Sequence, residues 1–302
     1  MRDIPFIDAH IHLWDVDRLR YPWLAPPYSA SGLAGSVEPI AKSYLPEHYR
    51  NDARGWNMIG AVHIDAGADP GDALAETEWL TGLAAKDDFP TAIVAFAPLN
   101  DTNIEALLEK QAAHSRVRGI RHIANWHSES YYSYTPANLL DDPSWERGYS
   151  ALARHGLSFD LQAYPAQLEQ AARIAERHDG IPVILNHCGM PIPARDPGRT
   201  EWRRGMAAFA QLSNASVKIS GFGITDHGWT TESIRPYVLE AIDMFGAERC
   251  MFASDFPTDK LYANFDRLLD AYAAIVADFS KAERRNLFAG NANRIYRLAL
   301  DF

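Results

Sequence analysis

Two histidines near the start of the chain, His10 and His12, stand two positions apart in the apolar stretch Phe-Ile-Asp-Ala-His-Ile-His. Side chains of a β-strand alternate between its two faces, so both imidazoles would project from the same face if this stretch is a strand. Two imidazoles on one face can bind a divalent metal ion or polarise one electrophilic atom. The alternative is a pair of core histidines that bind backbone groups, and the pair alone does not separate the two.

The elements that must position these histidines recur regularly along the chain. Short β-rich segments alternate with helical ones, which is the pattern of parallel βαβ units. We expect eight strands to close into an α/β fold, a single-domain (β/α)8 TIM barrel over residues 1–302. An open doubly wound sheet is the alternative, although no Gly-x-Gly-x-x-Gly motif follows any strand segment. The predicted strands are 6–12, 58–65, 92–98, 117–123, 157–163, 182–188, 216–221 and 250–256.

A long connection follows the first predicted strand, at about residues 14–45, and is rich in Pro, Gly and Ser between residues 21 and 39. Long loops without secondary structure of their own are usually functional. We expect this one to act as a lid over a site or as an oligomer contact.

Composition and charge restrict the class of function. The chain has 302 residues, 47% of them hydrophobic, and a formal net charge of −10 with acidic and basic residues interspersed. This charge argues against nucleic acid or an anionic membrane as a partner. No apolar stretch approaches the length of a membrane span, and the N-terminus lacks the apolar core of a signal peptide, so we expect a cytoplasmic protein. Cys188 and Cys250, the two cysteines, stand in apolar segments and are expected to be buried free thiols.

Polar residues terminate most of the predicted strands at the end where barrel enzymes carry their active sites. Each residue alone has a structural alternative, such as capping the following helix. Burying so many ionisable groups around one axis costs free energy unless they serve a site. These residues are His10 and His12, His63 and Asp65, Arg121 and His122, Asp160 and Gln162, Asn186 and His187, Lys218 and Ser220, and Ser254 and Asp255.

Four further motifs occur in order along the chain: Asn-His-Cys-Gly-Met-Pro at 186–191, Val-Lys-Ile-Ser-Gly at 217–221, Phe-Ala-Ser-Asp-Phe-Pro at 252–257 and Asn-Ala-Asn-Arg-Ile-Tyr-Arg-Leu at 291–298. Together with the first histidine pair, they resemble the amidohydrolase superfamily. Within it, the sequence resembles the amidohydrolase-related lactonases, which act on sugar-acid lactones, muconolactones and pyrone dicarboxylates. The resemblance implies a barrel enzyme that hydrolyses the ester bond of a small lactone.

The resemblance also implies roles for four residues. In the superfamily, the first-strand histidine pair and a sixth-strand histidine surround the reacting carbonyl or a divalent metal, which points to His10, His12 and His187. The eighth-strand aspartate, Asp255 here, would be the general base that takes a proton from the attacking water. His10, His12, His187 and Asp255 also form a plausible set of nitrogen and oxygen ligands for one zinc or manganese ion.

Two regions depart from the superfamily pattern. Many members have a bridging lysine or glutamate on strand four and a histidine on strand five, whereas this chain has Arg121-His122 and Asp160/Gln162 there. A binuclear centre is therefore not expected. Metal-independent catalysis also stays open, with protonated imidazoles and Arg121 or Lys218 stabilising the oxyanion.

Polar and aromatic residues are expected to orient the substrate. Arg121 offers a planar guanidinium suited to a carboxylate, and the segment 126–132 supplies hydroxyls, a ring platform, donors and acceptors. This mixture suits a polyhydroxylated or carboxylated small ring, and the alternative is a solvated surface loop. The predicted substrate-binding residues are Arg121, His122, Lys218, His63, Trp126, His127 and Tyr131.

We therefore predict a hydrolase of carbohydrate metabolism that opens a small carbohydrate-acid or related lactone, with Asp255 as the general base. Its partner would be the small-molecule lactone, and a homo-oligomer would be ordinary for such a barrel. The alternatives are a decarboxylase or a lactone isomerase of the same superfamily and, in a different class, a non-catalytic barrel that binds a small ligand.

Overall fold

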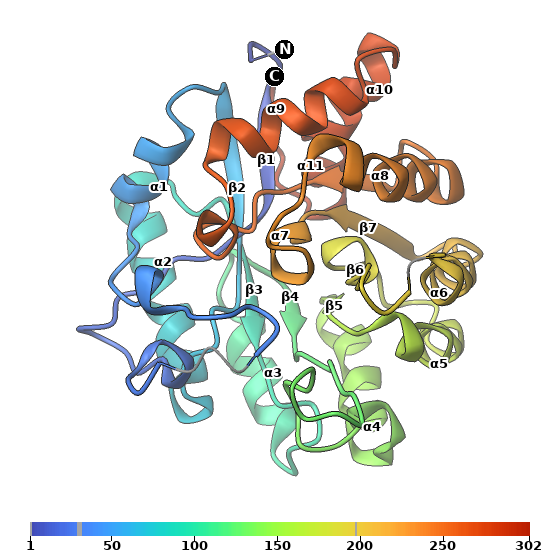
Figure 1. Cartoon of the computed structure of the whole chain (residues 1–302). Helices are drawn as coiled ribbons and strands as arrows, with labels where there is room; N and C mark the ends of the chain where they lie inside the picture. Colours follow the sequence, from blue (N-terminus) through green and yellow to red (C-terminus); the bar gives the residue numbers. More distant parts are fainter. Residues whose placement is uncertain (1, 29–31, 197) are drawn as a thin grey trace.

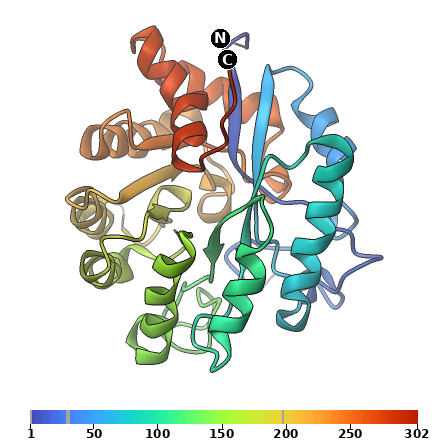
Figure 2. The same ribbon diagram turned by 180° about the vertical axis from the view of Figure 1, so that it is seen from behind.

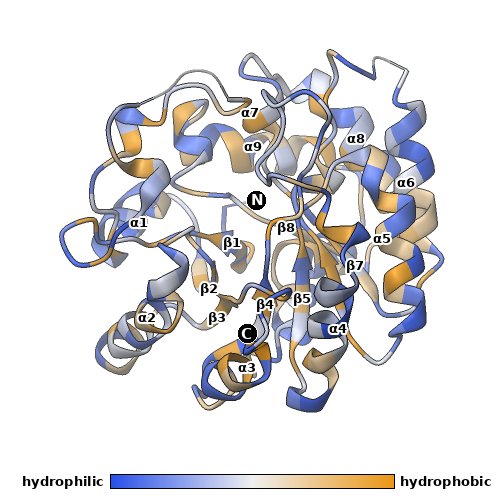
Figure 3. Cartoon of the chain, turned by 90° about the horizontal axis from the view of Figure 1, so that it is seen from below, coloured by the Kyte–Doolittle hydropathy of each residue, from blue (hydrophilic) through white to orange (hydrophobic). Residues whose placement is uncertain are grey.

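The computed structural model describes residues 2–28, 32–196 and 198–302. Eight parallel strands form one sheet in chain order, and the last strand returns to the first through a parallel bridge between Ile11 and Phe256. Figures 1 and 3 show the helices arranged around these strands. The predicted single-domain (β/α)8 barrel is confirmed. The strands are β1 (Phe6–Ile11), β2 (Met58–Ile64), β3 (Ala92–Phe96), β4 (Val117–Arg121), β5 (Ser158–Leu161), β6 (Val183–Leu185), β7 (Ala215–Ile219) and β8 (Cys250–Phe252).

The α-helices follow the strands in the expected alternation. No helix of the described residues combines the length and apolar composition needed to cross a bilayer. The helices are α1 (Pro46–Ala53), α2 (Ala73–Asp87), α3 (Ile104–Ala112), α4 (Pro143–Ala151), α5 (Pro165–Arg177), α6 (Thr200–Ala210), α7 (Phe222–Thr225), α8 (Thr231–Phe245), α9 (Phe265–Ile275), α10 (Lys281–Arg285) and α11 (Asn291–Ile295).

The long connection predicted at about residues 14–45 runs from β1 to α1. Its described part contains two 3₁₀ turns, Pro22–Leu24 and Glu38–Ile40, and residues 29–31 lie outside the described residues. An antiparallel bridge between Trp14 and Tyr44 joins its two ends. The connection therefore leaves the barrel and returns to the place where it left.

Apolar side chains cover both faces of the sheet. The outer faces of the strands pack against the helices in one large cluster that includes Phe6 and Ile11. A separate cluster inside the barrel includes Ile7, Ile184 and, from the C-terminal segment, Tyr296. Figure 2 shows the C-terminal segment running beside β1, at the end where the strands begin. The opposite end of the barrel is left for polar residues.

A β-bulge interrupts β1 close to the histidine pair. Asp8 lies opposite Ala61 of β2, but three residues later Ile11 lies opposite His63, which is only two residues further along β2. β1 therefore carries one extra residue over this interval. Such a bulge changes the face to which the following side chains point.

The bulge directs His10 and His12 into the barrel. Before it, Phe6 packs on the outer face and Ala9 packs in the inner cluster. Unbroken alternation would therefore place His10 on the outer face, beside the helices. After the bulge, Ile11 packs on the outer face. The neighbouring positions, His10 and His12, consequently face the barrel interior.

We predict that Gly148 is required for α4 to reach the barrel. A Cβ atom at Gly148 would lie 1.9 Å from the carbonyl oxygen of Leu99, whereas one at Gly82 in α2 would meet nothing within 4 Å. Gly148→Ala should lower the free energy of unfolding by about 2 kcal/mol through overpacking. The matched variant Gly82→Ala should raise it by about 0.5–1 kcal/mol through helix propensity. Chemical denaturation measures both, and equal effects would show that the close approach is not a constraint.

Candidate active site

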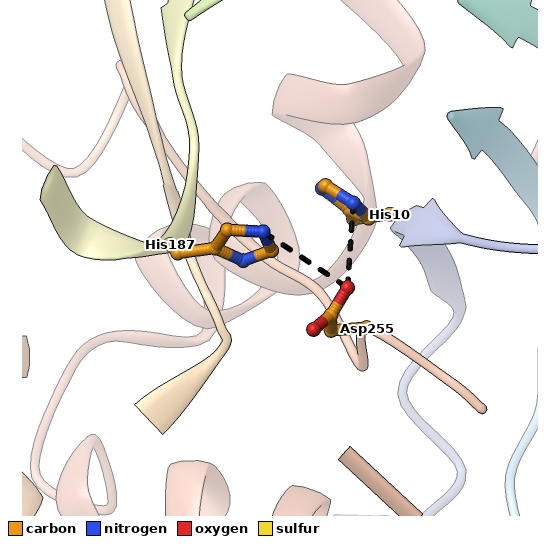
Figure 4. A group of neighbouring side chains, drawn as sticks. All are labelled: His10, His187 and Asp255. Carbon is orange, nitrogen blue, oxygen red and sulfur yellow. Dashed lines mark ion pairs between the residues drawn. The ribbon is translucent and has the colours of Figure 1, made fainter. Parts of the chain in front are cut away.

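Four side chains converge at the carboxyl end of the strands. The Nε2 atoms of His10 and His12 are 3.2 Å apart. Asp255 Oδ1 lies 3.2 Å from His12 Nε2, 3.4 Å from His10 Nε2 and 4.0 Å from His187 Nε2. Figure 4 shows the rings of His10 and His187 directed at the Asp255 carboxylate. These are the four residues predicted as catalytic groups and metal ligands, and they meet in a place where none is more than 5% exposed.

Hydrogen bonds behind the rings orient the imidazoles. His12 Nδ1 lies 2.7 Å from the carbonyl oxygen of Ile64, which can only accept, so Nδ1 carries the proton and Nε2 presents a lone pair. His187 Nδ1 lies 3.1 Å from Ser220 Oγ, which leaves Nε2 toward Asp255. Burial lowers the pKa of His12 to about 3 and the pKa values of His10 and His187 well below their ordinary range. The three rings are therefore neutral at physiological pH.

Asp255 supplies the carboxyl group of this cluster. Burial raises the pKa of Asp255 to about 8, against the opposing positive charges of Arg121 and Lys218. Oδ1 faces the histidines, and Oδ2 has no hydrogen-bond partner among the described residues. The raised pKa makes this carboxylate a stronger proton acceptor than an ordinary aspartate, whose pKa is about 4.

The cluster also fits one divalent metal ion. Ligand atoms of His10, His187 and Asp255 all lie within 4.8 Å of one another, and His12 Nε2 adds a lone pair beside them. Neutral imidazole nitrogens and a carboxylate oxygen are the ligands that zinc binds in proteins. The lone pairs of His12 Nε2 and Asp255 Oδ1 face each other without a proton between them if the carboxylate is ionised, an arrangement that a cation would stabilise.

The backbone turns sharply at two of these residues. The four residues 187–190 all have positive φ, between +49° and +70°, and Asp255 has a φ of +58°. The left-handed conformation costs about 1–2 kcal/mol for each residue other than glycine, and such strain clusters at functional sites. β6 and β8 consequently end before these turns, so the predicted strands 182–188 and 250–256 are too long at their carboxyl ends.

Gly221 makes room for the His187 ring. Its φ is +69°, and a Cβ atom there would lie 2.5 Å from His187 Nδ1. The Ser220–Gly221 step at the end of β7 therefore both binds the imidazole and leaves the space that it occupies.

Comparison with known proteins identifies the family of the chain. The sequence profile of the amidohydrolase family matches residues 7–298. The chain belongs to the amidohydrolase family. It is 41% identical to the uncharacterized protein y4mH of Sinorhizobium fredii, over 99% of this chain and 100% of the relative. It is 28% identical to an L-fucono-1,5-lactonase of Burkholderia multivorans, over 97% and 96% of the two chains.

A solved structure of an amidohydrolase from Burkholderia multivorans with bound zinc superposes on this one with a TM-score of 0.80. The two chains are 26% identical, and the match covers 97% of this chain and 99% of the other. The similarity therefore includes the whole barrel, with the strand ends that carry the cluster.

Arg121 of this amidohydrolase is already paired. Its Nε donates to Asp65 Oδ2 at 3.2 Å, its Nη2 donates to the Asp65 carbonyl oxygen, and its Nη1 donates to Gln162 Oε1 at 3.1 Å. The residue is 4% exposed. It stands close enough to the cluster for its charge to lower the pKa of His12 and of His187, but its carboxylate partner belongs to the protein.

Lys218 is likewise paired inside the barrel. Its Nζ donates to Asp160 Oδ1, and the same oxygen accepts a hydrogen bond from Tyr296 Oη at 2.8 Å. Burial lowers the pKa of Lys218 to about 8, against the opposing charge of Asp160. This predicted substrate-binding residue is fully buried and is bound to the C-terminal segment through Asp160.

His63 and His122 bind backbone groups. The backbone N–H of Leu13 donates to His63 Nδ1 at 3.1 Å, and that of Leu99 donates to His122 Nδ1 at 3.2 Å. His63 lies opposite Ile11, on the outer face of the sheet, so the structure does not bring it into the cluster. In this geometry, both rings hold the loop that follows a neighbouring strand.

Three further predicted residues lie in the connection between β4 and α4. The backbone N–H groups of Trp126 and His127 donate to Gln167 Oε1 and Ser133 Oγ, at 3.1 and 2.7 Å. Tyr131 is 46% exposed. These contacts fix the loop, and they leave the Tyr131 ring in contact with solvent.

Sequence reasoning missed two tyrosines that stand near the cluster. Tyr134, in the β4 connection, is 41% exposed, and partial desolvation followed by the negative charge of Asp255 raises its pKa. Burial raises the pKa of Tyr262 as well, with contributions from Asp259, Tyr134 and Asp255. Both tyrosines lie in irregular segments, where no periodicity or motif marks a residue as part of a site.

We predict that a methyl group at position 221 displaces the His187 ring. Gly221→Ala and Gly156→Ala both place alanine in the left-handed region, at φ values of +69° and +61°, but a Cβ atom at Gly156 meets nothing within 4 Å. Each variant should lose about 1–2 kcal/mol of stability from backbone strain. Only Gly221→Ala should also shift the ¹⁵N imidazole resonances of His187, measured with isotopically labelled histidine. Unchanged resonances would contradict the steric role of Gly221.

Proposed function

We propose that this protein hydrolyses the ester bond of a small carbohydrate-acid lactone. The observation that carries the proposal is the buried Asp255 carboxylate facing three neutral imidazoles at the carboxyl end of a (β/α)8 barrel. A relative that aligns with nearly the whole chain is named an L-fucono-1,5-lactonase. A non-catalytic binding barrel would have no need for a carboxylate of raised pKa at this position.

The reaction follows from the two oxygens of Asp255. Oδ1 lies against the Nε2 atoms of His10 and His12, and Oδ2 is the oxygen that would take a proton from the attacking water. The water oxygen bonds to the lactone carbonyl carbon, and the negative charge moves to the carbonyl oxygen. When the tetrahedral intermediate collapses, the ring C–O bond breaks, and the leaving oxygen receives the proton from Asp255. The product is the open hydroxy acid.

One divalent metal ion held by His10, His12, His187 and Asp255, zinc or manganese, would lower the pKa of a bound water towards ~7 and polarise the carbonyl. The surrounding residues keep the three imidazoles in the neutral form that can act as ligands.

The charges near the cluster favour a hydroxylated lactone over a carboxylated one. The cations predicted to meet a substrate carboxylate, Arg121 and Lys218, pair with Asp65 and Asp160. A muconolactone or a pyrone dicarboxylate would have to compete with these buried carboxylates, which is costly. A neutral sugar lactone needs no such cation. The expected cytoplasmic location and homo-oligomeric state stay predictions.

We predict that Asp255→Asn lowers kcat for lactone hydrolysis by at least about a thousandfold, because the amide cannot accept the proton of the water. A pH-indicator screen of aldonolactones, uronic-acid-derived lactones and muconolactones measures the activity. Asp278→Asn, a substitution of an exposed aspartate, is the matched control and should keep full activity. Wild-type rates in the Asp255→Asn variant would rule out the assigned base. Release of carbon dioxide, or a product that is still a lactone, would instead indicate a decarboxylase or an isomerase.

Removal of metal should abolish the same activity. Dialysis against a chelator is expected to lower turnover to background, and zinc or manganese should restore it at a stoichiometry of about one ion per chain, because the described residues offer one such set of ligands. Elemental analysis of the purified protein and titration with each ion measure this. Activity that survives complete metal removal would establish metal-independent catalysis by the same residues.

A further inference from the structure

Asn186 is a fully buried amide at the carboxyl end of β6. Neither its Oδ1 nor its Nδ2 has a hydrogen-bond partner among the described residues. An unpaired buried polar group costs about 1–3 kcal/mol, and native proteins pair nearly all of them. A side chain that leaves both atoms unpaired within the protein is therefore expected to bind something else.

The Asn186 side chain faces the barrel interior, next to the candidate active site. Leu185 packs in the outer cluster against the helices, and Ile184 packs in the inner cluster. The backbone N–H of Asn186 still donates to the carbonyl oxygen of Leu161 on β5, so the sheet continues through this residue. Alternation then places Asn186 on the same side as Ile184, and the following residue is His187.

A second buried amide lies nearby. Asn125, in the connection after β4, is 0% exposed, and its Oδ1 also has no partner among the described residues. Its Nδ2 lies 3.6 Å from Met190 Sδ, a weak acceptor at the end of the left-handed turn that begins at His187. The two unpaired amides are therefore joined to the same turn.

A third buried asparagine shows how the fold treats a structural amide. Asn291, at the start of α11, is 2% exposed, and its Nδ2 donates to the carbonyl oxygens of Ala247 and Cys250, both at 2.7 Å. This amide joins the C-terminal segment to β8. The asparagine amide is thus hydrogen-bonded at Asn291, away from the candidate active site, whereas that of Asn186, beside the site, has no partner among the described residues.

We propose that Asn186 is a specificity-determining residue that binds a ring hydroxyl of the lactone, with Asn125 as a second contact. The free Oδ1 of each asparagine requires a donor, and Nδ2 of Asn186 requires an acceptor. A hydroxyl can fill both roles at once, whereas a lactone carbonyl, a ring oxygen and a carboxylate only accept. This assignment rests on the proposed lactonase function, and it names the substrate class as a polyhydroxylated lactone.

Substrate selectivity would follow from the desolvation of these amides. A site built to bind a hydroxyl rejects an analogue that lacks it, because the buried polar atoms then stay unpaired. Replacing Asn186 by leucine, which has a similar shape, removes that penalty together with the hydrogen bonds. The substitution should therefore cost selectivity without costing stability.

The test compares two lactones of the same ring size on the wild type and on Asn186→Leu. The substrates are the best aldono-1,5-lactone of the substrate screen and δ-valerolactone, which carries no hydroxyl. Asn186→Leu should lower kcat/KM for the aldonolactone by about tenfold to a hundredfold. It should change kcat/KM for δ-valerolactone by less than about twofold, and its Tm should equal or exceed that of the wild type. Asn125→Leu should also lower the ratio of kcat/KM for the aldonolactone to kcat/KM for δ-valerolactone, by a smaller factor than Asn186→Leu does.

Asn291→Leu is the matched control. It should lower Tm, because two hydrogen bonds to backbone carbonyls are lost, and it should leave the ratio of the two kcat/KM values unchanged. If Asn186→Leu lowers kcat/KM equally for both lactones, the assignment is wrong. If it lowers kcat/KM for neither, the assignment is also wrong, and the Asn186 amide binds only water. A wild type that hydrolyses no lactone would overturn the proposed function itself, which separates the two failures.

Discussion

The convergence of lone pairs on buried side chains is the constraint on which this site depends. His12 Nδ1 donates its hydrogen bond to the carbonyl oxygen of Ile64, so its Nε2 presents a lone pair to Asp255 Oδ1, itself an acceptor when the carboxylate is ionised. Such an arrangement is unfavourable unless a proton or a metal ion joins the group. The barrel must therefore hold these side chains in place against their mutual repulsion, and the surrounding backbone is built to do so.

Three departures from regular structure supply that restraint. The bulge in β1 returns His10 and His12 to the interior, and the left-handed run that begins at His187 turns its ring toward Asp255. Gly221 leaves the space that the ring occupies. Each departure costs conformational energy locally, and the packed sheet and helices around it offset that cost. The strain is confined to strand ends, where the ladder of β-sheet hydrogen bonds stops.

The buried cations near the site form ion pairs with carboxylates of the protein itself, whereas two neutral amides have atoms without hydrogen-bond partners among the described residues. Arg121 and Lys218 pair with Asp65 and Asp160, in each case across one intervening strand of the sheet, and they act on the cluster through their electric field. The neutral amides of Asn125 and Asn186 keep unpaired atoms, as does the Asp255 carboxylate. A site of this kind suits a ligand that exchanges hydrogen bonds without bringing a charge.

The alternation of β-rich and helical segments predicted eight parallel βαβ units, because secondary-structure periodicity is encoded by residues next to one another in the chain. It left an open doubly wound sheet as the alternative to the barrel, and closure is shown by the bridge between Ile11 and Phe256. The same local rule placed His10 and His12 on one face, and the family motifs pointed to His187 and Asp255. Which face the pair occupies was decided by a bulge that exists only in the pairing with β2. The partners of Arg121 and Lys218 stand 56 and 58 residues away, and the isolation of Asn186 is a property of everything around it. Hydrogen-bond partnership and burial are set by closure of the barrel, so they were decided by the tertiary structure alone.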